Sequence, residues 1–259
     1  MLSAHGAASS YHRFVATNSQ YDEHVDFYLD FVDSQLADSV SLANVLAAVV
    51  QEVARDQVRG GDVLDVACGE GYLARRLLAL GPRSVVGIDA SENLLTAAAE
   101  RTAGLPVVFR LDDAQTLATV PDNSIDAAVS QMAIMDIPDI QAMFGAVARV
   151  LRPGGTFTFS MLHPCFQTPF RFPNQPPHLL EADDSRAAVL TRRYATEGYW
   201  QSGGTGVRGH MGAYHRTLAT ILNGLLSAGF ALRELREPLA GGSGLDGEVP
   251  FALVVHAEI

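Results

Sequence analysis

Short apolar runs alternate with amphipathic stretches along most of the chain, and each kind predicts a different element. Compact apolar runs, as expected for buried strands, occur at 63–66, 84–89, 107–110, 124–131 and 156–160. Helical periodicity occurs at 36–58, from Tyr72 onward, at 137–150 and at 218–228. Strands that alternate with helices predict an α/β fold built around a mostly parallel, doubly wound sheet.

The end of the chain carries its own signals. Thr217 is a suitable N-cap for the helix expected at 218–228, and Gly229 is a suitable stop. Two further strands are expected at 230–237 and 251–256, joined by a glycine-rich link.

A polar and aromatic segment at 11–32 precedes the first amphipathic stretch. Tyr21, Phe27 and Tyr28 belong to a set of aromatic residues that recur there at helical spacing. This spacing predicts a short helix with one aromatic face.

The composition shifts between 166 and 205 to proline, arginine and aromatic residues. We interpret this segment as an insertion that contains a helix at 182–190 and a strand at 193–200, followed by a glycine-rich turn at 203–206. Its aromatic residues suit the roof of an apolar pocket for a planar ligand, and a contact between two copies of the chain is the alternative.

The segment 63–72 combines an apolar run, an acid and two close glycines, which predicts a strand that turns tightly into a helix. Gly69 and Gly71 can adopt positive φ and let the backbone approach a ligand, while the helix expected from Tyr72 presents unpaired N–H groups. Such a turn suits an anionic or nucleotide-like ligand. No Gly-Lys-Ser or Gly-Lys-Thr follows, which excludes the phosphate loop of nucleotide hydrolases.

Acidic residues also end the next two predicted strands. Asp89 lies about 20 residues after the glycine turn, where doubly wound folds place a carboxylate for ribose hydroxyls. Asp112 and Asp113 follow the third strand. The carboxyl ends of these strands therefore predict one ligand site.

Together these motifs resemble the class I S-adenosylmethionine-dependent methyltransferases. The resemblance rests on the glycine turn with Asp65, on Asp89, on Asp113-Ala114, on 122–126 before the fourth strand and on 151–155 before the fifth. It is strong over 62–158, looser at the end of the chain and absent from 161–216. It implies a seven-stranded, mostly parallel sheet that ends in an antiparallel hairpin.

The resemblance implies S-adenosylmethionine as the cofactor and S-adenosylhomocysteine as the product. The backbone at Gly69 and Gly71 is expected to meet the methionine part, Asp89 the two ribose hydroxyls, and Asp113 the adenine amine. Further cofactor contacts are expected at Tyr28, Asp65, Ala67, Ala90, Ala114, Ser130 and Gln131.

The segments outside these motifs are expected to cover the site. Many small-molecule methyltransferases resemble this chain in having a Tyr-Asp pair followed by a second tyrosine, here Tyr21-Asp22 and Tyr28, in a lid helix. A packing helix over one face of the sheet is the alternative. We expect one methyltransferase domain over 1–259, with an N-terminal lid at 1–35 and a substrate-covering insertion at 161–216.

Nicotinamide-dependent oxidoreductases share this fold, so the residues have to distinguish the two families. The dinucleotide fingerprint wants a third glycine, where this chain has Ala74. A Ser-Tyr-Lys catalytic set cannot exist, because the chain contains no lysine. The residue pattern therefore favours S-adenosylmethionine.

Candidate acid–base residues lie beyond the fifth strand. That strand brings His163 to the ligand-binding edge of the sheet, so His163 is the base expected to face the acceptor. Tyr21 and His215 are expected to assist, although His215 suits a structural role at a helix start equally well. Cys165 is expected to be a packed thiol, with a nucleophile as the alternative.

Composition and charge limit the kinds of partner that the protein is expected to bind. The 259 residues carry a formal net charge of −11, with 18 basic residues against 29 acidic ones, which argues against nucleic acid. The two cysteines fit neither disulfide nor metal-ligand spacing, and no bound metal is expected. With no export signal and no apolar run long enough for a membrane span, we expect a cytoplasmic protein.

The expected reaction is methyl transfer from S-adenosylmethionine to a small aromatic or heteroaromatic acceptor, at carbon, nitrogen or oxygen. The alternative is a protein that binds S-adenosylmethionine for sensing, as a structural element or for a different reaction. A protein acceptor is a third reading, and a homodimer is compatible with the insertion.

Overall fold

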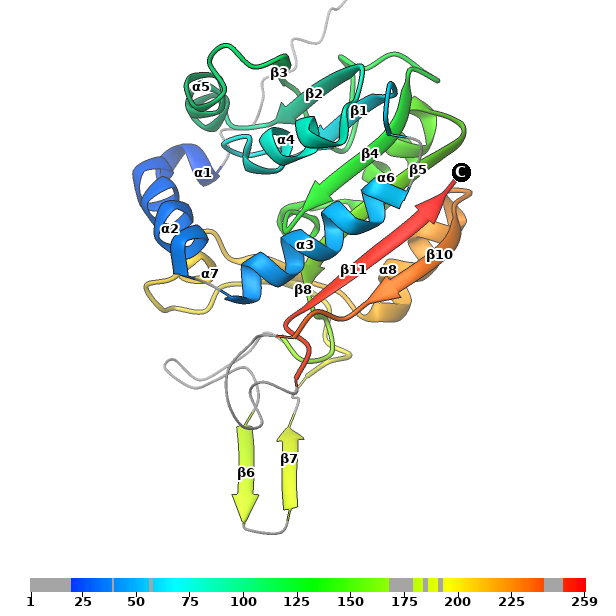
Figure 1. Cartoon of the computed structure of the whole chain (residues 1–259). Helices are drawn as coiled ribbons and strands as arrows, with labels where there is room; N and C mark the ends of the chain where they lie inside the picture. The colour runs from blue at the N-terminus through cyan, green and yellow to red at the C-terminus, as the bar shows by residue number, and fades with distance from the viewer. Residues whose placement is uncertain are drawn as a thin grey trace, which may run out of the picture.

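A seven-stranded sheet with the order β10-β11-β5-β4-β1-β2-β3 forms the centre of the protein (Figure 1). The structure is a computed structural model that describes residues 20–38, 40–55, 58–167, 179–183, 186–190, 193–239 and 249–259. The glycine-rich link at 241–247 and parts of the predicted lid and insertion lie outside these ranges.

The parallel part of the sheet contains β1 (Asp62–Val66), β2 (Ser84–Asp89), β3 (Val107–Leu111), β4 (Ile125–Gln131) and β5 (Leu151–Leu162). These strands confirm the predicted runs, and β5 extends beyond the expected segment at both ends. The strand order reverses where β1 meets β4, which in doubly wound sheets opens a ligand crevice at the carboxyl ends.

An antiparallel hairpin completes the sheet, as predicted. β11 (Ala252–Glu258) pairs with β5 on one side and with β10 (Ala231–Arg236) on the other. The run of buried residues along β11 reflects its position between two strands.

Helices cover both faces of the sheet. α3 (Val40–Arg55), α4 (Tyr72–Leu77) and α5 (Glu92–Arg101) lie on one face, with the 3₁₀ turn η1 (Leu78–Leu80), and α6 (Ile140–Val150) and α8 (Leu218–Ser227) lie on the other (Figure 1). α3 buries Val45, Val49 and Val53 at one-turn spacing against the sheet. Within the described ranges, no helix has both the length and the apolar character to cross a bilayer.

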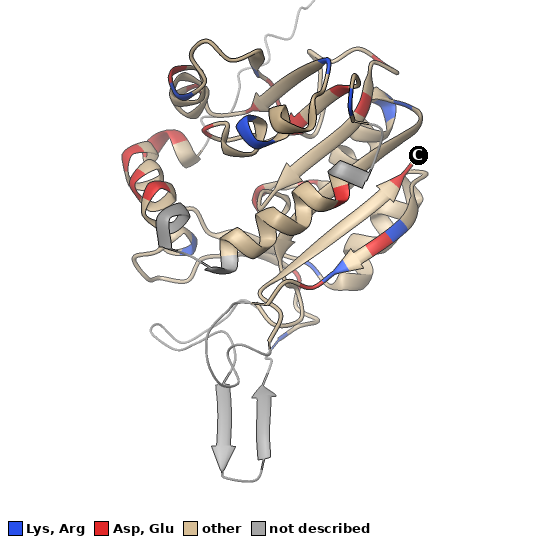
Figure 2. Cartoon of the chain, in the orientation of Figure 1, with Lys and Arg blue, Asp and Glu red and all other residues tan. Residues whose placement is uncertain are grey.

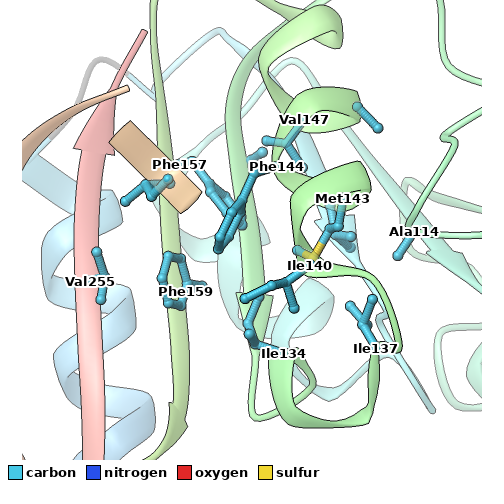
Figure 3. Packing of buried hydrophobic residues seen from close by; sticks show 14 of the residues in the cluster. Ala114, Ile134, Ile137, Ile140, Met143, Phe144, Val147, Phe157, Phe159 and Val255 are labelled. Atoms are coloured by element: carbon cyan, nitrogen blue, oxygen red, sulfur yellow. The ribbon is translucent and has the colours of Figure 1, made fainter. Parts of the chain in front are cut away.

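The larger core lies beneath α6. Phe144 packs against Phe157 and Phe159 of β5 with ring centroids 6.4 and 5.8 Å apart, beside Ile140 and Met143 (Figure 3). These side chains are fully buried, and burying each contributes about 1.5–3 kcal/mol. This layer holds β4 and β5 in place and so fixes the edge where the site lies.

Side-chain caps set the starts of both helices on this face. Thr217 Oγ1 accepts a hydrogen bond from Thr220 N at 3.2 Å, which confirms Thr217 as the N-cap of α8. The Asp139 carboxylate accepts from Gln141 N and Ala142 N, both at 3.0 Å, so α6 begins at Ile140, later than predicted.

The N-terminal helical prediction is confirmed in outline. α1 (Gln20–Glu23) and α2 (Val25–Asp38) are separated by a turn at His24, and both lie over the carboxyl edge of the sheet (Figure 1).

The insertion differs from its prediction. The helix expected at 182–190 is wrong, because β6 (Leu179–Asp183) and β7 (Arg186–Leu190) pair as an antiparallel hairpin. Strand pairing supplies the backbone hydrogen bonds that an alanine-rich stretch would otherwise satisfy as a helix. The strand expected at 193–200 is confined to β8 (Gly198–Trp200), which pairs with β9 (Ala213–His215), and α7 (Val207–His210) follows the predicted glycine-rich turn.

Candidate active site

The turn after β1 has the backbone geometry of a ligand cradle. Ala67, Gly69 and Gly71 have φ values of 56°, 53° and 78°, in the left-handed region that side chains disfavour. A Cβ added at Gly71 would lie 2.9 Å from Cζ of Phe109. Gly71 is thus required by both its conformation and its neighbours, and it leads directly into α4.

Asp89, at the end of β2, is held by this turn. Its Oδ2 accepts from Gly69 N at 2.8 Å and its Oδ1 from Ser91 N at 2.9 Å. Burial raises the pKa of Asp89 above its ordinary value, while these backbone amides act in the opposite direction. Because each carboxylate oxygen has two lone pairs, Asp89 can still accept from two hydroxyls.

Asp65 is the buried acid of the crevice. The residue is 1% exposed, and neither carboxylate oxygen has a hydrogen-bond partner within the described chain, although the Ala74 amide lowers its pKa in part. Burial first, and the charge of Asp89 second, raise the pKa of Asp65 to about 8. An orphaned carboxyl group at this place fits a ligand that supplies hydrogen-bond donors.

The end of β4, next to β1, carries further orphaned groups. Ser130 Oγ and Gln131 Oε1 are buried and have no hydrogen-bond partner among the residues described. Met132 follows with a φ of 55°, a strained value for a residue with a side chain. Together with Asp65, these groups fit the polar methionine end of S-adenosylmethionine.

The predicted adenine contacts lie at the end of β3. Asp113 is exposed and accepts from Gln115 N at 2.8 Å, and Ala114 beside it is buried. The structure places both at the expected edge. Their contact with the adenine stays a prediction.

The predicted lid helix α2 lies against the glycine turn. The Tyr28 hydroxyl lies 3.7 Å from the position of a Cβ added at Gly69. Its ring meets that of Tyr21 edge to face at 4.9 Å, and Tyr21 Oη donates to Asp136 Oδ2 at 2.9 Å. Burial, followed by the charge of Asp136, raises the pKa of both tyrosines, so both hydroxyls stay protonated at neutral pH.

We call α1 and α2 together the α1–α2 wall. Its side chains contact both the start and the end of α5. Asp22 accepts hydrogen bonds from Ser91 Oγ and from Asn93 N, next to Ala90. Asp33 forms two 2.9 Å bonds with Arg101, which also reaches Glu70 at 3.1 Å. Acidic residues gather along α1 and α2 (Figure 2), so these arginine and backbone donors supply the complementary charge.

A partly buried ion pair joins α7 to Asp136, the residue that accepts the hydrogen bond from Tyr21 of the wall. Arg208 pairs with Asp136 and donates to the Gly212 carbonyl at 2.7 Å. The ring of His210 lies 4.3 Å from that of Phe27 and 5.0 Å from that of His24. The sequence analysis missed Arg208, because its partner lies 72 positions away and the glycine-rich turn before it indicates only a loop.

His163 lies at the end of β5, as predicted, but both of its ring nitrogens are bonded to the protein. Nε2 lies 2.8 Å from Glu237 Oε1, and Nδ1 accepts from Cys165 N at 3.2 Å. The side chain is almost fully buried, and burial lowers the pKa of His163 despite the glutamate. The described contacts do not bring His163 together with Tyr21.

His215 lines a cavity beside the crevice. Its Nε2 lies 2.7 Å from the Tyr194 carbonyl, which can only accept, so Nε2 carries the proton and Nδ1 is the acceptor. Burial lowers the pKa of His215 and favours this neutral form.

The cavity lies where β4 and β5 end and β9 crosses them. Met135, which belongs to the 3₁₀ turn η2 (Ile134–Asp136), lies beside Asp136, the partner of Tyr21. Side chains and backbone from several segments line it: Met135, Met161, Leu162, Pro164, Gln167, Trp200, Ala213, Tyr214, His215 and Arg216. Apolar, aromatic and polar residues share this lining, and the cavity has a volume of about 20 Å³, so a ligand larger than water has to displace lining side chains. Among the residues that the structure describes, no three His, Cys, Asp or Glu side chains are grouped to hold a metal ion.

The comparisons with known proteins agree with this geometry. A family model described as a methyltransferase domain matches residues 63–155. The chain is 26% identical over 232 residues to an uncharacterized protein of Haemophilus influenzae, covering 85% of this chain and 86% of that one. It is 35% identical over 112 residues to a ubiquinone biosynthesis O-methyltransferase of Methylococcus capsulatus, covering 42% of this chain and 47% of the relative.

A solved structure extends the likeness over most of the fold. The S-adenosylmethionine-dependent methyltransferase of Mesorhizobium loti superposes with a TM-score of 0.68 at 26% identity, covering 83% of this chain and all of that one. The chain spans about half the length of the O-methyltransferase above. Residues 63–155 match a methyltransferase domain, the sequence and the fold together support a class I S-adenosylmethionine-dependent methyltransferase, and S-adenosylmethionine is its cofactor.

Proposed function

We propose that this protein transfers the methyl group of S-adenosylmethionine to a small planar acceptor bound in the cavity beside His215. The observation that carries the proposal is the set of orphaned polar groups of Asp65, Ser130 and Gln131 at the ends of β1 and β4. They lie at the switch point of the sheet, next to an aromatic-lined cavity.

The residues on the β1–β2–β3 side hold the cofactor. The sulfonium of S-adenosylmethionine supplies an electrophilic methyl group. The turn at Gly69 and Gly71 lets the backbone approach the cofactor closely, Asp89 accepts from the ribose hydroxyls, and Asp113 with Ala114 faces the adenine. Tyr28 covers the glycine turn, so the wall excludes water from the reacting end.

The cavity side orients the acceptor. Trp200 and Tyr214 offer aromatic surfaces, and Met135 and Met161 fill the space between them. Orientation of the two reactants at near-contact distance can supply about 7–11 kcal/mol of the barrier reduction. The chain therefore needs to add little chemistry of its own.

His215 is the residue that we assign as general base for an acceptor that must lose a proton. It lines the cavity, its Nε2 proton is fixed by the Tyr194 carbonyl, and its Nδ1 can take a proton. His163 is less suited, because both of its nitrogens are bonded within the protein. Tyr21 donates a hydrogen bond to Asp136 and serves as part of the wall.

The first experiment is calorimetric titration with S-adenosylmethionine and S-adenosylhomocysteine. The wild type is expected to bind both ligands at micromolar concentration. Asp89→Ala is expected to lower the affinity at least about a hundredfold, which is about 2.7 kcal/mol of binding free energy. Asp126→Ala is the control, because Asp126 lies at the amino end of β4, away from the carboxyl ends of the strands where the cofactor binds. Wild-type affinity in Asp89→Ala would contradict the assigned cofactor site.

Turnover separates methyl transfer from its alternative. A panel of planar phenols, amines and heterocycles is incubated with the cofactor, and release of S-adenosylhomocysteine is measured. Release together with a methylated product supports the proposal. Cofactor binding without methylation of any panel member would favour a protein that uses S-adenosylmethionine for sensing or for another reaction.

A further inference from the structure

We infer that the acceptor carries an anionic group, a carboxylate or a phosphate, and that Arg216 recognises it in the cavity beside His215. The inference rests on the proposed function in one respect, that the acceptor occupies this cavity. It adds the chemical class of the acceptor and a residue that sets specificity.

Arg216 is the single formally charged side chain that lines the cavity within the described residues. The residue is 9% exposed, and it makes no ion pair with any described carboxylate. Glu197 and Asp139 act on Arg216 only through space, because each is hydrogen-bonded to a helix start instead. Its positive charge is therefore incompletely compensated in a chain whose net charge is −11.

Arg208, which is partly buried, provides the contrast. Arg208 has the Asp136 carboxylate as its partner. Removing a charge from water costs several kcal/mol per ion, and buried charges are normally paired for that reason. A buried arginine without a carboxylate partner is expected where a ligand supplies the anion.

Backbone carbonyls hold the Arg216 guanidinium in place. Nη2 donates to the carbonyls of Ile137 and Pro138, both at 2.6 Å, and Nη1 to that of Ile134 at 3.5 Å. Tyr214 packs its ring 5.1 Å from Cζ. Of the five guanidinium hydrogens these bonds use three, which leaves Nε–H and one Nη1 hydrogen for a ligand. A fixed donor group loses little entropy when it binds an anion.

Among the described residues, the rest of the cavity lining carries no second positive charge. Its other side chains are apolar, aromatic or amide, apart from His215, whose Nδ1 is an acceptor in the neutral form. An acid that displaces the lining side chains can place its anionic group toward Arg216.

Trp200 provides a direct probe of binding. It is the chain's one tryptophan and lines the cavity, so its fluorescence reports occupancy without any need for turnover. Protein saturated with S-adenosylhomocysteine is titrated with hydroxybenzoates, aminobenzoates and phenyl phosphate, and with the matching benzamides. The acids are expected to bind at least about tenfold more tightly than the amides, as charge-assisted hydrogen bonds exceed neutral ones.

Two variants of Arg216 and one control sharpen the result. Arg216→Gln is expected to reduce the preference for acids to within about twofold, and Arg216→Lys to retain part of it because the charge stays. Arg110→Gln is the control, because it removes an equal positive charge from β3, at the other side of the sheet from the cavity. The Arg110 guanidinium donates to the Thr119 carbonyl at 2.9 Å, and its loss should leave the preference for acids unchanged. Thermal unfolding checks that each variant is folded.

The outcomes distinguish this inference from the proposed function. A preference for acids that disappears in Arg216→Gln supports the inference, even if no acid is methylated. A panel in which no acid perturbs Trp200 more than its amide does, or an unchanged preference in folded Arg216→Gln, overturns it. Methylation of neutral acceptors alone would also overturn it while leaving the proposed function intact.

Discussion

The cofactor side and the proposed acceptor side of the crevice are built from different kinds of contact. On the cofactor side, a backbone turn and short-range contacts define the site: Asp89 meets Gly69, 20 positions away, and Ser91, two positions away. On the acceptor side, side chains from distant segments meet: Tyr21 reaches Asp136 across 115 positions, and Arg216 reaches Ile137 across 79.

The difference explains which side can vary. A cradle of backbone N–H groups depends on few side chains, so it binds one constant cofactor in many sequences. An enclosure of side chains changes with each substitution and suits an acceptor that differs between proteins. Perturbing each side should therefore affect different measurements.

The largest effect is expected in catalysis, at His215. His215→Asn should lower turnover by about 10²- to 10⁴-fold with an acceptor that must lose a proton, and leave cofactor binding unchanged. Because burial lowers the pKa of His215, wild-type turnover should fall only as the pH drops below about 6.5, the ordinary histidine value. The pH dependence of kcat measures this.

His163→Asn is the matched control. It should reduce turnover less than tenfold, because the ring is bonded to Glu237 and Cys165 within the protein. If His163→Asn abolishes turnover and His215→Asn does not, the assignment of the base is reversed.

A comparable effect on stability is expected at Asp136. Asp136→Ala leaves the partly buried Arg208 without its carboxylate and should lower the free energy of unfolding by about 1–3 kcal/mol, measured in urea. Asp122→Ala breaks an ion pair with Arg149 in which the aspartate is 64% exposed, and should cost less than about 1 kcal/mol. Equal costs for the two variants would show that the wall contact is no stronger than a surface pair.

An intermediate effect is expected on the cofactor side. Gly71→Ala should lower the free energy of unfolding by about 1–3 kcal/mol, because the alanine must adopt positive φ and its Cβ lies too close to Phe109. Gly87→Ala places a Cβ 2.7 Å from the same ring without positive φ. Phe109→Ala should therefore rescue Gly87→Ala more than Gly71→Ala, as thermal unfolding can measure. If Phe109→Ala restores the stability of both variants equally, backbone strain does not contribute to the cost of Gly71→Ala.

The smallest effect is expected at the end of α2. Asp33→Asn weakens the contact with Arg101, and because the aspartate is 59% exposed, stability should fall by less than about 1 kcal/mol. S-adenosylhomocysteine should nevertheless dissociate faster, which stopped-flow fluorescence can follow. Asp30→Asn is the control on the same helix, and a similar acceleration there would point to charge alone.

The same contrast explains what the sequence could predict. The individual strands, the glycine turn and Thr217 as a cap follow from local patterns of apolar and special residues. The seven-stranded sheet, its C-terminal hairpin and the cofactor residues follow from the resemblance to the methyltransferases, and the contacts of the cofactor residues stay predictions.

The acceptor side required the structure. The helix expected at 182–190 was wrong because a hairpin partner overrides local propensity. Arg208 and Arg216 were missed because no pattern near them indicates a partner 72 or 79 positions away. His163 was predicted correctly in position, but the contacts that occupy its ring come from Glu237 on the far side of the hairpin.

The α1–α2 wall has a thermodynamic consequence. Tyr28 faces the glycine turn, Tyr21 faces Asp136, and their rings touch at 4.9 Å, so one continuous surface borders both halves of the crevice. A ligand that orders the wall on one side reduces the ordering cost for the other ligand. Linkage then requires that cofactor and acceptor raise each other's affinity by the same factor.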